Sequence, residues 1–196
     1  MTLATVTELK ADILMLRRNE KDFLARKDLK YVDRFQKNLG KLTNDFKTVE
    51  GKVDEYELDL GQVAKFKATY IPYAETFLQL VEEQKNVGLH PKDGYYGDLR
   101  AAVHTVEELL KQDNSYRLLT DMLQLRRAEK DFMLRRDSKY LGKFEQTLAE
   151  FNQHLMSENI NNGTKNEIRN GLEIYDQQFK KLVKAEQVIG LDSKSG

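Results

Sequence analysis

Residues 12–35 read DILMLRRNEKDFLARKDLKYVDRF, and residues 121–144 read DMLQLRRAEKDFMLRRDSKYLGKF. Aligned at an offset of 109, the two segments are identical at 14 of 24 positions. A second pair of segments, 73–94 and 175–196, aligns at an offset of 102. The offsets differ by 7 residues (109 − 102), about two helical turns, which a helical repeat tolerates without moving its apolar face. Self-similarity of this kind is typical of a repeated structural unit, so we predict an internal duplication.

The apolar residues of each copy recur every three or four positions, which is the spacing of one helix face. This stripe starts at Ile13 in the first copy and at Met122 in the second, and it continues beyond the aligned segment, so we expect one long helix in each place. Eleven glycines and two prolines among 196 residues leave little material for turns and disfavour an all-β fold. The expected fold is all-α, an elongated antiparallel helical bundle of two stacked modules, residues 1–112 and residues 113–196.

The second copy is shorter than the first. After residues 91–94 (PKDG) the first copy continues with the helical segment YYGDLRAAVHTVEELLKQ, whereas the second has no counterpart before Gly196. We therefore expect the last helix to be missing and the chain to be a fragment of a longer parent.

Several residue patterns indicate where helices begin and end. A capping box opens a helix because two side chains three residues apart bind each other's backbone amides, and glycine closes a helix by adopting a left-handed conformation. The candidates are Asp54 with Glu57, Thr164 with Glu167, Gly88 and Gly190. The segment 113–115 (DNS) favours a break between two helices.

The composition excludes several classes of function. Thirty-two basic and 32 acidic residues cancel, which gives no electrostatic basis for binding nucleic acid or a membrane surface. The chain has no cysteine, and no stretch approaches the roughly 20 apolar residues that a membrane-spanning helix needs. It also lacks a glycine-rich phosphate loop and a nucleophile elbow. We expect no enzymatic activity and no cofactor.

Two glutamates, Glu20 and Glu129, occupy matched positions on the apolar face, which we call the seam of each module. A lone carboxylate there would carry a large desolvation penalty and needs a partner. Arg17 and Arg126, three residues earlier, border the same seam. One interpretation is a structural polar cluster that fixes helix pairing. The other is that the arginines keep donors for a carboxylate ligand between helices, since a guanidinium grips a carboxylate through two parallel bonds.

Other charged residues give weaker signals. Arg18 and Arg127 stand in charge ladders of four-residue spacing, which are usually exposed salt bridges. Arg100 follows Gly94 near an expected helix N-terminus, where free amides favour anions, and is a second candidate anion contact. His104 precedes two glutamates at a spacing that metal ligands also use, but a single such element predicts no metal site.

Three segments carry a resemblance to a known family: MLRRNEKDFLARKDLKYVDRF, LQLRRAEKDFMLRRDSKYLGKF and GLHPKDGYYGDLRAAVHTVEELL. With them the chain resembles the helical bimodular (HBM) sensor domain of bacterial methyl-accepting chemotaxis proteins. The resemblance implies a periplasmic domain held between two transmembrane helices of the inner membrane, usually in a homodimer. It also implies that small organic acids bind between helices and that helix displacement carries the signal. The matching motif makes Arg17 and Arg126, followed by Arg18 and Arg127, the ligand-binding candidates.

The sequence leaves three alternatives open. The same sensor could belong to a sensor kinase or a cyclase. The chain could instead be a structural or adaptor helical bundle whose polar seam only fixes the pairing of helices. A metalloprotein built around His104 is the third alternative, and it would require stoichiometric metal.

Overall fold

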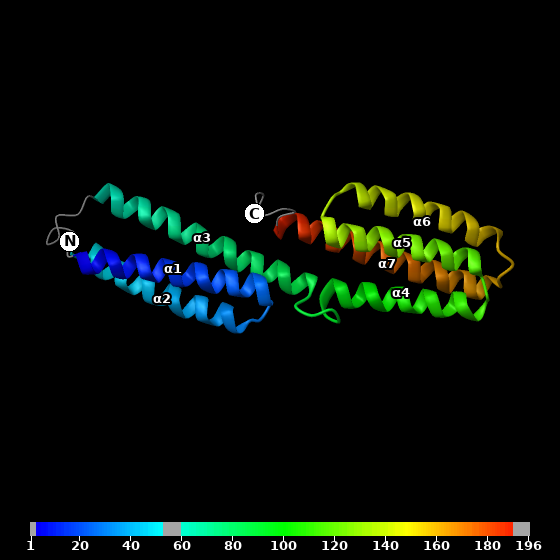
Figure 1. Cartoon of the computed structure of the whole chain (residues 1–196), viewed down its shortest axis with the longest axis horizontal. Helices are drawn as coiled ribbons and strands as arrows, with labels where there is room; N and C mark the ends of the chain where they lie inside the picture. The colour runs from blue at the N-terminus through cyan, green and yellow to red at the C-terminus, as the bar shows by residue number, and fades with distance from the viewer. Residues whose placement is uncertain (1–2, 53–59, 190–196) are drawn as a thin grey trace. The chain divides into compact units, whose positions relative to one another are not determined.

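The computed structural model describes residues 3–52 and 60–189. Within these ranges the chain forms seven α-helices and no strand, so the predicted all-α fold is confirmed (Figure 1). The helices are α1 (Leu3–Arg26), α2 (Lys30–Glu50), α3 (Leu60–Val87), α4 (Gly94–Gln112), α5 (Tyr116–Arg135), α6 (Lys139–Ser157) and α7 (Asn162–Ile189).

The expectation of one long helix in each copy is wrong, because each stripe is divided into a hairpin of two helices. Lys27 ends the first helix of one hairpin and Arg136 ends that of the other, both with φ at 53°. This left-handed backbone is uncommon for residues other than glycine, and it turns the chain out of the helix. The stripe continues across the turn because both helices bury their apolar faces against each other.

An aspartate stabilises the start of the second helix in each hairpin. The Lys30 amide donates to Asp28 Oδ1 at 3.0 Å, and the Lys139 amide donates to Asp137 Oδ1 at 2.9 Å. These bonds satisfy one of the free amides that every helix N-terminus carries. The signal lies in the sequence as an aspartate at the same place in both copies.

The other predicted boundaries have mixed outcomes. The break at 113–115 is confirmed, and α3 ends directly before Gly88, whose φ is 121°. The start at Thr164 is wrong, since α7 begins earlier and Asn161 Oδ1 accepts the Thr164 amide at 2.8 Å. The signals at Asp54, Glu57 and Gly190 lie outside the described residues.

The chain divides into two compact units, unit 1 (Met1–Glu82) and unit 2 (Glu83–Gly196). This division differs from the predicted modules 1–112 and 113–196. The difference arises because α4 packs against α7 and α5, and therefore belongs with the helices that follow it. The predicted modules describe the sequence repeat, whereas the units describe packing.

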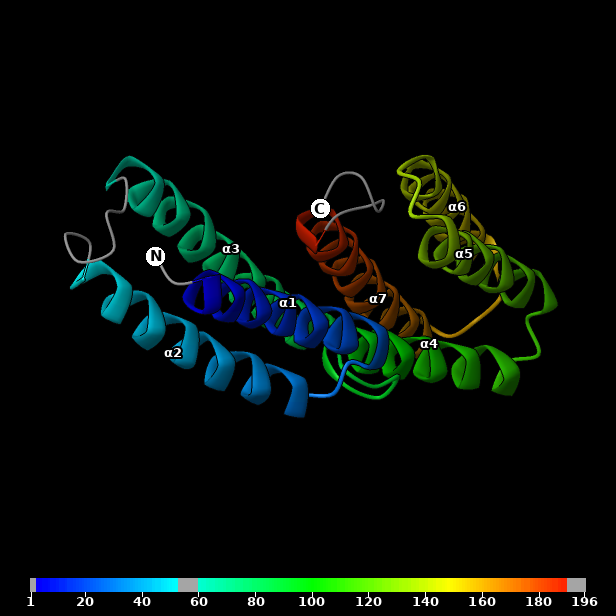
Figure 2. The same cartoon turned by 60° about the vertical axis from the view of Figure 1, so that its left-hand side comes forward.

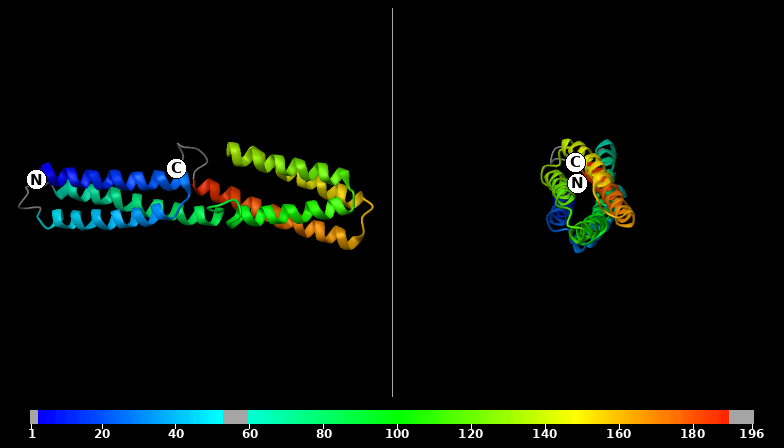
Figure 3. Two further views of the ribbon diagram at one scale, coloured as in Figure 1. Left: turned by 60° about the horizontal axis from the view of Figure 1, so that its bottom comes forward. Right: turned by 90° about the vertical axis from the view of Figure 1, so that its right-hand side faces the viewer.

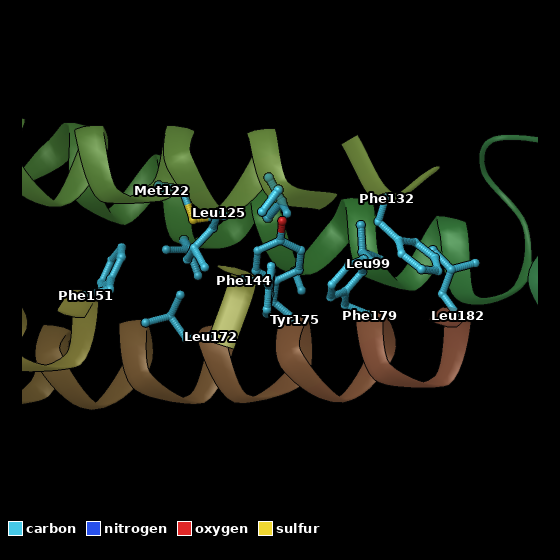
Figure 4. Close-up of a cluster of buried hydrophobic side chains, with 14 of the residues drawn as sticks. Leu99, Met122, Leu125, Phe132, Phe144, Phe151, Leu172, Tyr175, Phe179 and Leu182 are labelled. Atoms are coloured by element: carbon cyan, nitrogen blue, oxygen red, sulfur yellow. The ribbon is translucent and has the colours of Figure 1, made fainter. Parts of the chain in front are cut away.

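Unit 2 is an antiparallel four-helix bundle (Figures 1 and 2). In it α4 contacts α5 and α7, and α6 contacts the same two helices, so the four form a closed ring. The connection from α6 to α7 runs over one end of the bundle (Figure 3). Aromatic and aliphatic side chains fill the interior, and Figure 4 shows Phe132, Phe144, Tyr175 and Phe179 among them.

Unit 1 repeats the aromatic core of unit 2 with three helices. The α1–α2 hairpin corresponds to α5–α6, and α3 supplies Phe77 where α7 supplies Phe179. The ring centroids of Phe35 and Phe77 lie 4.3 Å apart, and those of Phe144 and Phe179 lie 4.5 Å apart. Phe23 likewise meets Phe77 edge to face. The matched residues therefore pack alike, while the duplication itself stays a prediction.

Candidate functional site

The seam glutamate of unit 2, Glu129, is 1% exposed. Its Oε2 accepts the Tyr175 hydroxyl at 2.6 Å, and its Oε1 lies 3.1 Å from Lys130 Nζ. Burial raises the pKa of Tyr175, and the negative charge of Glu129 raises it further. The pair is a polar contact inside an apolar core, and Figure 4 shows the tyrosine oxygen in red.

The seam glutamate of unit 1, Glu20, is only partly buried. It accepts a hydrogen bond from Tyr73 of α3, as Glu129 accepts one from Tyr175. Partial burial raises the pKa of Tyr73, and the bond to Glu20 adds to the shift, while the positive charge of Arg17 opposes it. The same pair of residue types is therefore more accessible to solvent in unit 1 than in unit 2.

Arg126 holds a carboxylate that sequence reasoning did not assign to it. Its Nη1 donates to Glu107 Oε1 of α4 at 2.8 Å. The side chain of Arg126 is 38% exposed and that of Glu107 is 14% exposed. The sequence does carry a signal for Glu107, because it stands four residues after Val103 and three before Leu110, two apolar residues of α4, and therefore shares their face. The pair joins α4 to α5 at the edge of the core.

Arg17, the matched residue of unit 1, is exposed on α1. No hydrogen bond or ion pair joins its guanidinium to another residue in the described part of the chain. Its charge nevertheless acts on Tyr73, which places it in the same electrostatic neighbourhood as the Glu20 carboxylate. Arg17 is thus a guanidinium beside the seam with its donors available.

The remaining candidate arginines lie on outer surfaces. Arg18 is exposed and lies 3.9 Å from Asp22, a spacing that gives a weak solvated pair. Arg127 and Arg100 are exposed, and within the described ranges neither takes part in a hydrogen bond or an ion pair. The structure does not gather these three residues at the seam with Arg17 or Arg126.

A concavity of about 190 Å³ lies between α6 and α7 of unit 2. Its lining residues are Leu148, Asn152, Arg169, Leu172, Glu173 and Asp176. None of them was a sequence candidate. The signal is faint, because mixed polar and apolar residues at helical spacing are what any partly exposed helix face contains.

The described residues contain no cluster of three or more side chains placed to hold a metal ion. His104 Nδ1 lies 3.9 Å from Glu107 Oε2, and that glutamate is engaged by Arg126. Among the helices that the structure describes, none combines the length and the apolar character needed to cross a bilayer.

Comparison of the chain with known protein families, with curated proteins and with solved structures finds no match. The resemblance to the HBM sensor domain therefore rests on the motifs of the sequence alone.

Proposed function

We propose that the chain is an extracytoplasmic sensor domain of a bacterial chemoreceptor and that it binds a small organic acid through Arg17. One observation carries the proposal. Arg126 grips a carboxylate at 2.8 Å, while the matched Arg17 has no such partner among the described residues and stands beside the Glu20–Tyr73 pair. A side chain that binds a carboxylate in one copy is suited to bind one in the other.

The proposed mechanism is a shift between helix packings. A ligand on Arg17 would contact α1 beside the α3 hydroxyl of Tyr73, so its binding energy depends on how these two helices pack. A ligand changes such an equilibrium only by the difference in its affinity for the two packings. The proposal includes a homodimeric parent, anchored in the inner membrane by flanking helices, with no enzymatic activity of its own.

Calorimetric titration with malate and succinate tests the binding step. We expect 1:1 binding that Arg17→Gln weakens by about 10- to 100-fold, the worth of a charged hydrogen bond. Lys10→Gln is the matched control, since Lys10 is an exposed cation one heptad earlier on α1. Equal binding by Arg17→Gln and the native chain would contradict the proposal.

A second candidate is a structural or adaptor bundle. It is favoured by unit 2, where Glu129 and Glu107 are already satisfied by other side chains and hold helices together. This candidate would be favoured if no organic acid binds the native chain and if Arg17→Gln is as stable as the native chain. A sensor kinase or cyclase would bind ligand in the same way, and only its output module would differ.

A further inference from the structure

We propose that Glu107 is an internal carboxylate ligand of Arg126, which closes unit 2 to free carboxylates, and that releasing it creates a second carboxylate site. This inference rests on the proposed function, because it takes Arg17 and Arg126 to be equivalent binding groups. It predicts that the native chain binds organic acid in unit 1 only.

The geometry of the pair is that of a bound ligand. Glu107 reaches Arg126 from α4, a different helix, and contacts one guanidinium nitrogen at 2.8 Å. Its side chain is 14% exposed, so the carboxylate is largely removed from water, whereas the arginine keeps 38% of its surface accessible. Partial desolvation strengthens the attraction relative to an exposed pair.

Removing Glu107 would leave Arg126 without its partner on α4. The charges of Glu129, Arg126 and Glu107 all act on the pKa of the Tyr175 hydroxyl, so these groups lie in one neighbourhood. If Glu107 were removed, Arg126 would border the carboxylate of Glu129, whose two oxygens are engaged by Tyr175 and Lys130. In the described part of the chain Arg126 has no hydrogen bond or ion pair besides the one to Glu107, so its guanidinium would then have donors available.

A tethered carboxylate excludes free acids by its effective concentration. Glu107 is held on α4, and α4 packs against both α5 and α7, so its carboxylate is always near Arg126. Short tethers give effective concentrations in the millimolar range or above. A free acid can bind Arg17 without competition. To bind Arg126, the same acid must first displace the carboxylate of Glu107.

Among the described residues, the unit 1 counterpart Arg17 has no internal ligand. No described helix of unit 1 presents a glutamate to Arg17, and the face of α1 that carries it is exposed. The matched arginines thus differ in state: the guanidinium of Arg17 in unit 1 is available, and that of Arg126 in unit 2 is occupied by Glu107.

Chemical rescue tests the inference. We prepare Glu107→Ala in an Arg17→Gln background, which removes the proposed unit 1 site, and follow thermal unfolding with added formate or acetate at pH 7.5. We expect Glu107→Ala to lower the midpoint temperature of unfolding. Added acetate should restore most of the lost stability. At acetate concentrations above the Kd of acetate for this site, each tenfold rise in concentration should raise the folding equilibrium constant about tenfold. Sodium chloride at equal ionic strength should not do so.

Two control variants make the result specific, and a third variant replaces Glu107→Ala if that protein does not fold. Glu108→Ala removes the next carboxylate of α4, which is exposed, and should show no rescue. Glu107→Ala with Arg126→Gln should lose the rescue, since acetate then has no guanidinium. If Glu107→Ala does not fold, Glu107→Ser also removes the carboxylate and leaves room for acetate, and acetate binding is then measured by calorimetry.

The possible outcomes separate this inference from the proposed function. Rescue that depends on Arg126 supports the internal ligand, whatever malate does at Arg17. A folded Glu107 variant that acetate neither stabilises nor binds would overturn it. Binding of organic acid at Arg126 with Glu107 intact, seen as a second site that Arg126→Gln removes, would also overturn it.

Discussion

The two units place the same residue types in different surroundings. In unit 2 the Tyr175 hydroxyl and the Glu129 carboxylate are closed inside four helices, with exposures of 0% and 1%. In unit 1 the corresponding Tyr73 and Glu20 are partly exposed, and the described part of this unit contributes three helices. The comparison teaches that the repeated motif determines which side chains meet. Whether the contact is sealed depends on the helix that packs over it.

The first prediction concerns what the units share. Phe144→Ala in unit 2 and Phe35→Ala in unit 1 should each destabilise their unit by about 3–5 kcal/mol, because both rings are fully buried against a second aromatic ring. Urea unfolding of the two variants measures the loss. A small loss of stability for Phe35→Ala alone would show that the two cores are not equivalent. Leu14→Ala is the control, because Leu14 is exposed and its replacement should change the stability little.

The second prediction concerns α4, which packs against α7 in unit 2 and has no counterpart in the described part of unit 1. A Cβ added at Gly171 of α7 would come within 2.6 Å of Val106 Cγ2 of α4. At the same offset α3 carries Thr69, which is exposed. Gly171→Thr, which gives unit 2 the residue of unit 1, should therefore cost about 1–3 kcal/mol through overpacking. Thermal unfolding measures it, and a neutral result would mean that α4 is not closely packed there.

The third prediction compares the two tyrosine–glutamate pairs. Tyr175→Phe leaves a buried carboxylate with one donor fewer and should cost about 1–2 kcal/mol, whereas Tyr73→Phe should cost less because water can replace the hydroxyl. Chemical denaturation at pH 7 measures both. Equal losses would show that burial does not distinguish the pairs.

The raised pKa of Tyr175 adds a pH dependence with a defined sign. Its stabilising contribution is complete below the unfolded tyrosine pKa of about 10 and is lost as the pH rises above that value, because the unfolded chain then releases a proton that the folded chain retains. Between pH 10 and 12 the native chain should lose stability faster than Tyr175→Phe. Parallel curves would contradict this.

The smallest expected effect lies in the hairpin turns, where the units agree. Hydrogen bonds from Lys30 and Lys139 lower the pKa of Asp28 and of Asp137, so each stabilises its turn above about pH 4 and stops doing so as the pH falls below it. Asp28→Asn and Asp137→Asn should each cause a small loss of stability at pH 7, and this loss should shrink as the pH falls below about 4. Unequal losses in thermal scans at pH 7 would distinguish two turns that the structure shows as alike.

The fold class followed from period and composition, and two helix ends followed from local chemistry. The break at 113–115 and the stop at Gly88 depend on a few neighbouring residues, which is why sequence reasoning reaches them. The hairpin turns escaped it because Lys27 and Arg136 do not favour left-handed backbone. Their conformation depends on the packing of the two helices of each hairpin, which is not a local property.

The partners of the charged residues were the least predictable part. Asp12 and Asp121 are matched in the repeat, yet Asp12 binds Lys41 and Asp121 binds His154, each at 2.6 Å. Likewise the Arg126 partner lies 19 residues earlier, on a helix outside the motif. A motif fixes which side chains point inward, but the group that meets them comes from a distant segment whose position depends on the whole bundle.

The Glu129–Tyr175 bond also sets the alignment of α5 along α7. A slide of one helical turn, about 5.4 Å, would bring Leu125 or Met133 to the tyrosine hydroxyl and carry the carboxylate among apolar side chains. Intermediate displacements would break the bond without offering another. Sliding between these two helices is therefore confined to small excursions about one position, and larger rearrangements of unit 2 must proceed by tilting or by separation of the helices.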